Sequence, residues 1–396
     1  MSAPPVYLNE LGIVCALGCG QQAVAGALFA ADAARGVATT DGYTPGRPLP
    51  LGAVQSALPD LADCEMPFRS RNNALLRAAF AQIREATAAA IERHGAHRVA
   101  VVIGTSTSGI GEPERALPHL LAHGQWPADF HYEQQEMGAP SRFVARESGA
   151  RGPAWTISTA CSSSAKALAS AARLLRAGIV DAVIAGGADS LCAFTIGGFS
   201  ALESVSARRC NPFSRHRDGI NIGEGAALFL LTRGPGPVRL AGWGESSDAH
   251  HMSAPEPQGT GAIAAIAQAL ARGGIGADDV GYVNLHGTAT PQNDAMESRA
   301  VFATLGEAVP MSSTKPLTGH ALGAAGAIEA GLCWLAMARN PGNHLPPHWW
   351  DGAADPGLPP LDFVVPGRRT QAPLRYVLSQ SFAFGGSNAV LLLGEG

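Results

Sequence analysis

The chain has 396 residues, of which 46% are hydrophobic and only 15% are charged, and its formal net charge is −4. This length allows one large core or two packed halves, and the composition excludes a disordered or fibrous chain. Because the chain has no overall basic charge, we expect no nucleic-acid partner.

Seven cysteines lie scattered along the chain without a CxxC pair or a Cys/His metal spacing. We therefore expect neither a metal site nor a disulfide framework, and reduced thiols favour the cytoplasm. The N-terminus has no basic region before its short apolar run, which argues against a signal peptide. The most apolar helix candidate, Ala321 to Ala338, contains Glu329 and is predicted to be a core helix, not a membrane span.

The predicted elements of the first half begin with an apolar strand, VAVVIGTSTSG (99–109), that ends in a Gly-Thr loop. A second strand, WTISTACSSSAK (155–166), continues into a helix of small residues and carries Cys161. Two further strands are predicted over 181–186 and 225–232. The Pro-rich stretches at 45–50 and 341–360 are predicted to be surface loops.

The second half repeats this order. VGYVNLHGTAT (280–290) is again a strand that runs into a Gly-Thr loop, and a strand with a small-residue helix follows at 309–338. The last strands are predicted over 376–379 and 388–393. Apolar strands that alternate with helices predict βαβ units, so we expect an α/β fold of two pseudo-symmetric halves whose loops meet. Chance similarity of short apolar segments is the alternative.

Cys161 is the first candidate for chemistry, because it lies where a strand gives way to a helix. The helix dipole and free N–H groups at a helix start favour an anion, which predicts a lowered pKa for this thiol. Taken alone, however, a cysteine in such a place is more often a buried, unreactive residue.

Two histidines lie in strand-to-helix loops of the second half, His286 in HGTAT and His320 in STKPLTGH. We expect them at places that correspond to the Cys161 loop. Lys315 lies in the same loop as His320, and it is one of only two lysines among 28 basic residues. A buried lysine needs a carboxylate partner, which Glu329 or Glu297 could supply.

The segment SFAFGGSN (381–388) places two glycines after an aromatic residue. Such a turn leaves backbone amides free, and these can donate to a developing oxyanion. The chain has no GxSxG elbow, Walker loop, GxGxxG fingerprint or HExxH helix, which counts against common hydrolases, NTPases, dehydrogenases and zinc proteases.

The motifs TACSSS, HGTAT, STKPLTGH, GAAGAIEA and FAFGGSN, in this order, resemble those of a β-ketoacyl-[acyl carrier protein] synthase of the two-histidine type. The resemblance covers nearly the whole chain, including 215–227 and 246–255. It implies a thiolase-like fold, with two βαβαβαββ halves (1–235 and 236–396) in an α-β-α-β-α sandwich. It also implies a homodimer, no cofactor, and decarboxylative Claisen condensation between an acyl group and malonyl-carrier protein.

The resemblance implies a role for each of five residues. Cys161 resembles the nucleophile that takes the acyl chain from a carrier-protein thioester. His286 and His320 resemble the pair that binds the malonyl thioester and stabilises its enolate. Lys315 resembles the family's active-site lysine, with Glu329 as its partner.

Other roles carried over from the family are less specific. The amides of Cys161 and Phe384 would form the oxyanion hole, and Phe384 resembles the gating phenylalanine. The substrate-binding positions would be Thr288, Thr290, Phe382 and, near the end of the acyl pocket, Ile110; an ordinary core position is the alternative for Ile110. Carrier proteins are acidic, so a basic patch is expected, and its candidates are Arg69, Arg71, Arg208 and Arg209; ordinary solvated arginines are the alternative.

The chain departs from the family pattern at Ala383, where glycine is common, and in the serine run after Cys161. TACSSSAK and GGADSLC look closer to synthases of aryl-polyene or polyketide-type pathways than to those of fatty acid synthesis. A thiolase would need a second catalytic cysteine, and the second half offers only Cys333. A non-catalytic chain-length-factor subunit would lack Cys161. We therefore favour a competent enzyme, either as a homodimer or as the active half of a heterodimer.

Overall fold

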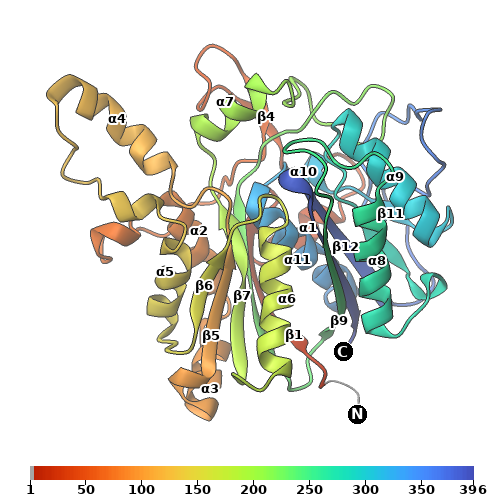
Figure 1. Ribbon diagram of the computed structural model, residues 1–396, viewed down its shortest axis with the longest axis horizontal. Coiled ribbons are helices and arrows are strands. Elements are labelled where there is room, and N and C mark those ends of the chain that lie inside the picture. The colour runs from red at the N-terminus through yellow and green to blue at the C-terminus, as the bar shows by residue number, and fades with distance from the viewer. Residues whose placement is uncertain (1–3) are drawn as a thin grey trace.

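The computed structural model describes residues 4–396 (Figure 1). The first half contributes five strands, paired in the order β6-β5-β7-β8-β1. Their bounds are β1 Tyr7–Cys15, β5 Val99–Gly104, β6 Ala154–Ile157, β7 Ala182–Asp189 and β8 Gly225–Thr232. Strands β6, β5 and β7 are parallel to one another, whereas β8 is antiparallel to both β7 and β1.

The second half repeats this arrangement as β11-β10-β12-β13-β9. The bounds are β9 Val238–Ser247, β10 Tyr282–Asn284, β11 Met311–Ser312, β12 Tyr376–Ala383 and β13 Ser387–Glu395. The strand directions match those of the first half. The predicted pair of pseudo-symmetric βαβαβαββ halves is therefore confirmed. The two sets join where Tyr7 and Leu8 of β1 pair with Arg239 and Val238 of β9.

The helices form three layers around these strands (Figure 1). Their bounds are α1 Gln21–Leu28, α2 Arg71–Phe80, α3 Arg84–His94, α4 Gly111–His123, α5 Ala139–Ser148, α6 Ser163–Arg176, α7 Ala193–Ala201, α8 Thr260–Gly273, α9 Pro291–Leu305, α10 Lys315–Thr318 and α11 Ala325–Ala338. Helices α6 and α11 contact each other and strands of both halves, so they form the central layer. Helices α2 and α5 cover one outer face, and α8 and α9 cover the other, which confirms the sandwich.

The central helix α11 explains the run of small residues in its sequence. All but its last two residues are buried, so it needs no polar face. A Cβ at Gly326 would come within 2.9 Å of Ala165 on α6, so glycine lets the two helices touch. The predicted core helix is confirmed, although it starts at Ala325, after a short 3-10 turn at Leu322–Ala324. No helix within residues 4–396 is long and apolar enough to cross a membrane.

Three short strands and two loops complete the fold. The short strands are β2 Gly18–Cys19, β3 Ala38–Thr40 and β4 Leu49–Leu51. Strand β4 pairs with β3, so the end of the stretch 45–50, predicted to be a loop, is a strand instead. Residues 341–360 form a loop without helix or strand, as predicted, but the prediction of a surface position is wrong for residues 345–348, which are buried. The predicted boundary between residues 235 and 236 lies in the turn that joins β8 to β9.

Candidate functional site

The turn between β6 and α6 presents Cys161 at the centre of the molecule. Ala160 adopts a left-handed conformation, with φ of 51°, which is unusual for a residue with a side chain. The Ser163 hydroxyl donates to the carbonyl of Ala160 over 2.6 Å, and the Ser164 hydroxyl accepts a hydrogen bond from the N–H of Ala327 on α11 over 2.8 Å. These serines therefore hold a strained turn and tie it to the other half.

Lys166 is the second rare lysine, and it also reaches the other half. Its ammonium group donates to the hydroxyl of Ser387 over 2.6 Å. The Ser162 hydroxyl donates to the same oxygen over 3.1 Å. Ser387 directly follows the Phe-Gly-Gly turn, so Lys166 and Ser162 link the Cys161 turn to the base of that turn.

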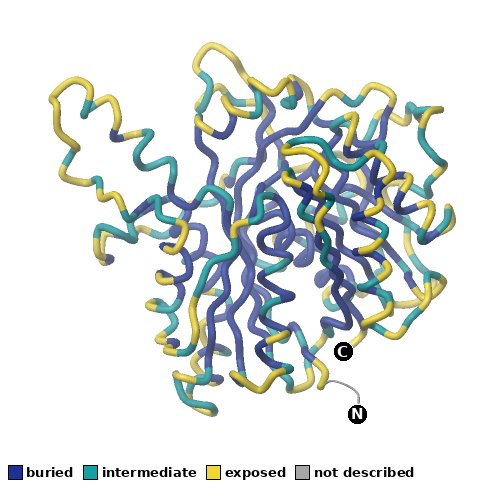
Figure 2. Tube along the Cα trace, viewed as in Figure 1, coloured by how far each residue is buried: buried dark blue, intermediate teal, exposed yellow. Residues whose placement is uncertain are grey.

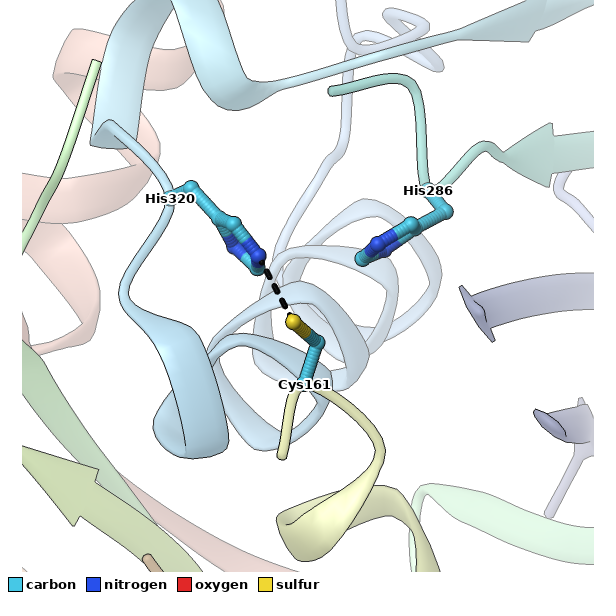
Figure 3. A group of neighbouring side chains, drawn as sticks. All are labelled: Cys161, His286 and His320. Carbon is cyan, nitrogen blue, oxygen red and sulfur yellow. Dashed lines mark hydrogen bonds between the residues drawn. The ribbon is translucent and has the colours of Figure 1, made fainter. Parts of the chain in front are cut away.

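The two histidines approach Cys161 from the second half, as Figure 3 shows. The Nε2 atom of His320 lies 3.0 Å from the Sγ atom of Cys161. The His286 and His320 rings lie 5.3 Å apart between centroids, nearly perpendicular at 83°. All three side chains are buried. One expectation needs correction, because only the His320 loop, after β11, corresponds to the Cys161 loop after β6. The His286 loop, after β10, corresponds to the loop after β5.

Lys315 and two carboxylates organise the His286 side of the site. The Lys315 ammonium group donates to Glu329 and to the backbone carbonyl of His286, and it lies 3.4 Å from Nδ1 of that ring. Because an ammonium group only donates, Nδ1 acts as the acceptor and Nε2 of the neutral ring carries the proton. Glu297 accepts hydrogen bonds from the backbone N–H groups of His286 and Gly287, at 2.6 and 2.7 Å. Glu329 is thus the partner of Lys315, and Glu297 fixes the histidine loop.

Burial dominates the proton affinities of the site. It raises the pKa of Cys161 to about 11, and the Lys315 charge and the backbone amides of Phe384 and Cys161 only partly oppose it. The predicted lowered pKa is therefore wrong, because the cost of burying a charged thiolate outweighs the favourable position at the helix start. Burial and the Lys315 charge hold the pKa of His286 and His320 well below the ordinary value, so both rings are neutral.

The three side chains open into a cavity of about 270 Å³. Thr288, Thr290, Phe382 and Phe384 line it, and the two threonine hydroxyls lie 2.9 Å apart. Sequence reasoning did not single out several other lining residues, namely Phe199, Leu202, Ser204, Ile220, Ser253, Pro255, Gln292, Asn293 and Asn388. Phe199 of α7 lies 5.7 Å from Phe384 between ring centroids, so α7 supports the candidate gate. Ile110 precedes α4 and is not among the lining residues.

The four arginines considered for carrier-protein binding have different surroundings. Arg69 donates to the carbonyls of Cys64 and Ala62. Arg71 pairs with the fully buried Glu224. Arg209 donates to the carbonyls of Pro316, Val37 and Arg35. The Arg208 side chain is 71% exposed and pairs with Asp218 at the surface. The first three therefore brace loops, and only Arg208 presents a mostly exposed guanidinium.

Residues 70–235 match the N-terminal domain of β-ketoacyl synthases, and residues 238–347 match the C-terminal domain. The chain belongs to the β-ketoacyl synthase family. This membership confirms the expected condensing-enzyme class and accounts for the thiolase-like fold.

Three known proteins are similar to this family member over most of its length. The 3-oxoacyl-[acyl-carrier-protein] synthase 2 of Coxiella burnetii is 34% identical over 324 residues, which cover 77% of each chain. A ketosynthase structure in complex with its chain length factor, from Xenorhabdus doucetiae, matches with 47% identity and a TM-score of 0.93, over 99% of this chain and 98% of the other. The third match is a chain from the structure of a type II polyketide synthase acyl carrier protein in complex with its ketosynthase. The identity is 25% and the TM-score is 0.86, over the full length of both chains.

We expect opposite effects on Cys161 from removing the two members of the buried ion pair. The Lys315 charge lowers the pKa of the thiol and the Glu329 charge raises it. Lys315→Met should therefore slow the alkylation of Cys161 by iodoacetamide at a fixed pH, and Glu329→Gln should accelerate it. Lys315→Met leaves a buried carboxylate unpaired, so it should also lower the free energy of unfolding by about 3–5 kcal/mol. Equal alkylation rates in both variants would contradict this electrostatic role.

Proposed function

We propose that Cys161, His286 and His320 together carry out the decarboxylative condensation of a β-ketoacyl-[acyl carrier protein] synthase. The observation that carries the proposal is the 3.0 Å contact between Nε2 of His320 and the Cys161 sulfur, with His286 facing the same cavity. The thiol accepts an acyl group, and two neutral imidazoles stand where an anion must be stabilised next to it.

In the first step, the Cys161 sulfur attacks the carbonyl carbon of an acyl-carrier thioester. The backbone N–H groups of Cys161 and Phe384, which already lower the pKa of the thiol, donate to the resulting oxyanion. The carbon–sulfur bond to the carrier then breaks, and the carrier's thiolate takes up the proton that Cys161 lost. The acyl group is left as a thioester on Cys161.

In the second step, malonyl-carrier protein loses carbon dioxide, and the electron pair of the broken bond moves onto the thioester oxygen. His286, whose Nε2 carries a proton, and His320 donate hydrogen bonds to this enolate oxygen. The enolate carbon then attacks the acyl carbonyl on Cys161, a carbon–carbon bond forms, and the Cys161 thiolate leaves and takes up one proton from the solvent, which restores the thiol. The product is a β-ketoacyl-carrier protein. Thr288 and Thr290, which line the cavity, would contact the malonyl group.

We place this reaction in polyene or polyketide-type biosynthesis, in the cytoplasm. The 47% identity to a chain of the ketosynthase/chain-length-factor complex exceeds the 34% identity to the 3-oxoacyl synthase. All seven cysteines are free, which suits a reducing compartment. Primary fatty acid synthesis is the alternative pathway. Of the four arginines considered, Arg208 is the exposed candidate contact for the carrier protein.

We also propose that β6 and α4 form a subunit interface, with a second copy or with a chain-length-factor-like subunit. The β11 edge of the sheet is covered by residues 362–364, whereas β6 ends the sheet on the other side. An uncovered strand edge favours pairing with another chain. On α4 and the segment after it, which projects from the same side of the molecule (Figure 1), Leu121, Trp126 and Tyr132 are 78%, 44% and 67% exposed, and Figure 2 shows this segment mostly in yellow and teal. An interface would cover these apolar side chains, which are otherwise left in water.

The proposed function is tested by incubating the protein with malonyl-carrier protein and an acyl-carrier protein, with and without a chain-length-factor-like subunit. Saturated, polyenoyl and aromatic acyl groups are offered separately, and the product is followed by mass spectrometry. We expect β-ketoacyl-carrier protein and one carbon dioxide per product, with the polyenoyl group preferred. Absence of product from all three acyl groups, in both conditions, would contradict the proposal.

A further inference from the structure

Asp189, the last residue of β7, is a fully buried carboxylate that the proposed mechanism does not use. One group of donors lies in the loop after β5: the hydroxyl and backbone N–H groups of Ser106 and Thr107, and the hydroxyl of Thr105. The remaining donor is the backbone N–H of Gly323 in the second half, at 2.6 Å. Both carboxylate oxygens accept several hydrogen bonds, so Asp189 joins two loops that belong to different halves.

Each of the two joined loops contains a residue in strained backbone conformation. Ser108 has φ of 49° in the loop after β5, and Leu322 has φ of 48° directly before Gly323. A left-handed conformation costs roughly 1–2 kcal/mol for residues with a side chain, and it persists only where surrounding contacts enforce it. The Thr105 hydroxyl, which donates to Asp189, also accepts a hydrogen bond from the N–H of Ser108. Asp189 is thus bonded at both strained turns.

The strained turn at Leu322 begins two residues after His320. The backbone N–H of His320 donates to the carbonyl of Asn221, and its carbonyl accepts from Gly223, so its own peptide groups are fixed. Beyond His320, the bond from Gly323 to Asp189 fixes the chain. A Cβ at Gly323 would come within 2.7 Å of the Asp189 carboxylate and within 2.6 Å of the Ser106 nitrogen, so only glycine allows this approach.

We infer that Asp189 is a positioning residue for His320: its carboxylate holds the turn that aims the imidazole Nε2 at the Cys161 sulfur. This inference rests on the roles proposed above for His320 and Cys161. Asp189 touches neither the sulfur nor the cavity, so it acts only through the loop. A charged carboxylate is needed because backbone N–H groups donate to both of its oxygens. A hydroxyl can donate or accept a hydrogen bond, but a backbone N–H can only donate, so both oxygens must be acceptors.

The isosteric change Asp189→Asn tests this role. Whichever way the amide is turned, its NH2 group faces at least one backbone N–H, from Ser106, Thr107 or Gly323. We expect the rate of Cys161 alkylation by iodoacetamide and the condensation kcat to fall about 10- to 100-fold, as for outer residues that orient a reacting group. The KM for malonyl-carrier protein should change less than about twofold, because the threonines of the malonyl site are untouched.

The deciding measurement is a double-mutant cycle. In a His320→Ala background, Asp189→Asn should slow Cys161 alkylation by less than about twofold, because the side chain that it positions is absent. The same loss in both backgrounds would overturn the inference. If Asp189→Asn does not fold, Ser106→Ala takes its place in the same cycle, because it removes one hydroxyl donor to Asp189. We expect a smaller decrease in the rate of Cys161 alkylation, and no decrease in the His320→Ala background.

Asp181→Asn is the matched control, because Asp181 lies at the opposite end of β7, where it pairs with Arg98 at 2.7 Å. It should leave both rates unchanged. Alkylation needs no carrier substrate, so the two proposals fail separately. In one outcome the protein forms no condensation product, while the effects of Asp189→Asn and His320→Ala on Cys161 alkylation still depend on each other. That result would support the positioning role of Asp189 and contradict only the proposed function.

Discussion

Replacing Cys161 with alanine is expected to lower the condensation rate by at least about 10³-fold and to leave the protein folded. The loss is expected to be complete because the acyl group then has no sulfur to bind and the two carrier-bound substrates cannot react through an enzyme thioester. The fold should tolerate the change, since alanine is only slightly smaller and the turn is held by Ser163 and Ser164. Product is quantified by mass spectrometry, and folding is checked by circular dichroism and thermal melting.

Cys210→Ala is the matched control for this experiment. Cys210 is also fully buried, and burial raises its pKa to about 12, yet it does not line the cavity. We expect its product yield to match that of the unchanged protein. An undiminished yield from Cys161→Ala would show that another group accepts the acyl chain.

The second large effect is a separation of acyl loading from elongation in the histidine variants. His286→Ala and His320→Ala should both acquire the acyl group on Cys161, yet elongation should fall about 10²–10³-fold, as when an oxyanion donor is removed. His320→Ala should load more slowly than His286→Ala, because only His320 contacts the sulfur, at 3.0 Å. Intact-protein mass spectrometry measures loading, and the yield of β-ketoacyl-carrier protein measures elongation.

Thr290→Ser serves as the control, because it keeps the hydroxyl of the cavity wall while removing a methyl group. It should load and elongate within a few-fold of the unchanged protein. A histidine variant that elongates as fast as this control would contradict the role of that imidazole, and failure to load in both variants would contradict the separation of the two steps.

The sequence predicts those parts of the site that follow from the order of strands, loops and motifs along the chain. The echo between VAVVIGTSTSG and VGYVNLHGTAT reflects the equivalence of β5 and β10, and the rarity of lysine identifies the buried Lys315. In β1 and β9, by contrast, polar residues and glycines break the apolar runs, so neither strand is predicted. The glycines of β9 are needed because a Cβ at Gly244 would come within 1.7 Å of the Ala265 carbonyl on α8.

The properties that the sequence does not predict depend on burial and on contacts between distant residues. The helix start favours a lowered pKa at Cys161, but desolvation in the finished fold outweighs it. From the sequence, Arg71 is a candidate for a surface contact with the carrier protein. In the fold it instead pairs with the buried Glu224, which lies 153 residues away in the sequence. Asp189 ends an apolar strand, and its donors come from loops 83 and 134 residues distant. No local pattern encodes such partners.

The most direct measurement of the central claim is peptide mapping of the unchanged protein after incubation with acyl-carrier protein alone. We expect one acyl group per chain, carried by the peptide that contains Cys161, and its loss when malonyl-carrier protein is added and product forms. An acyl group on Cys192 or Cys210, or product formation without any acylated peptide, would contradict the claim.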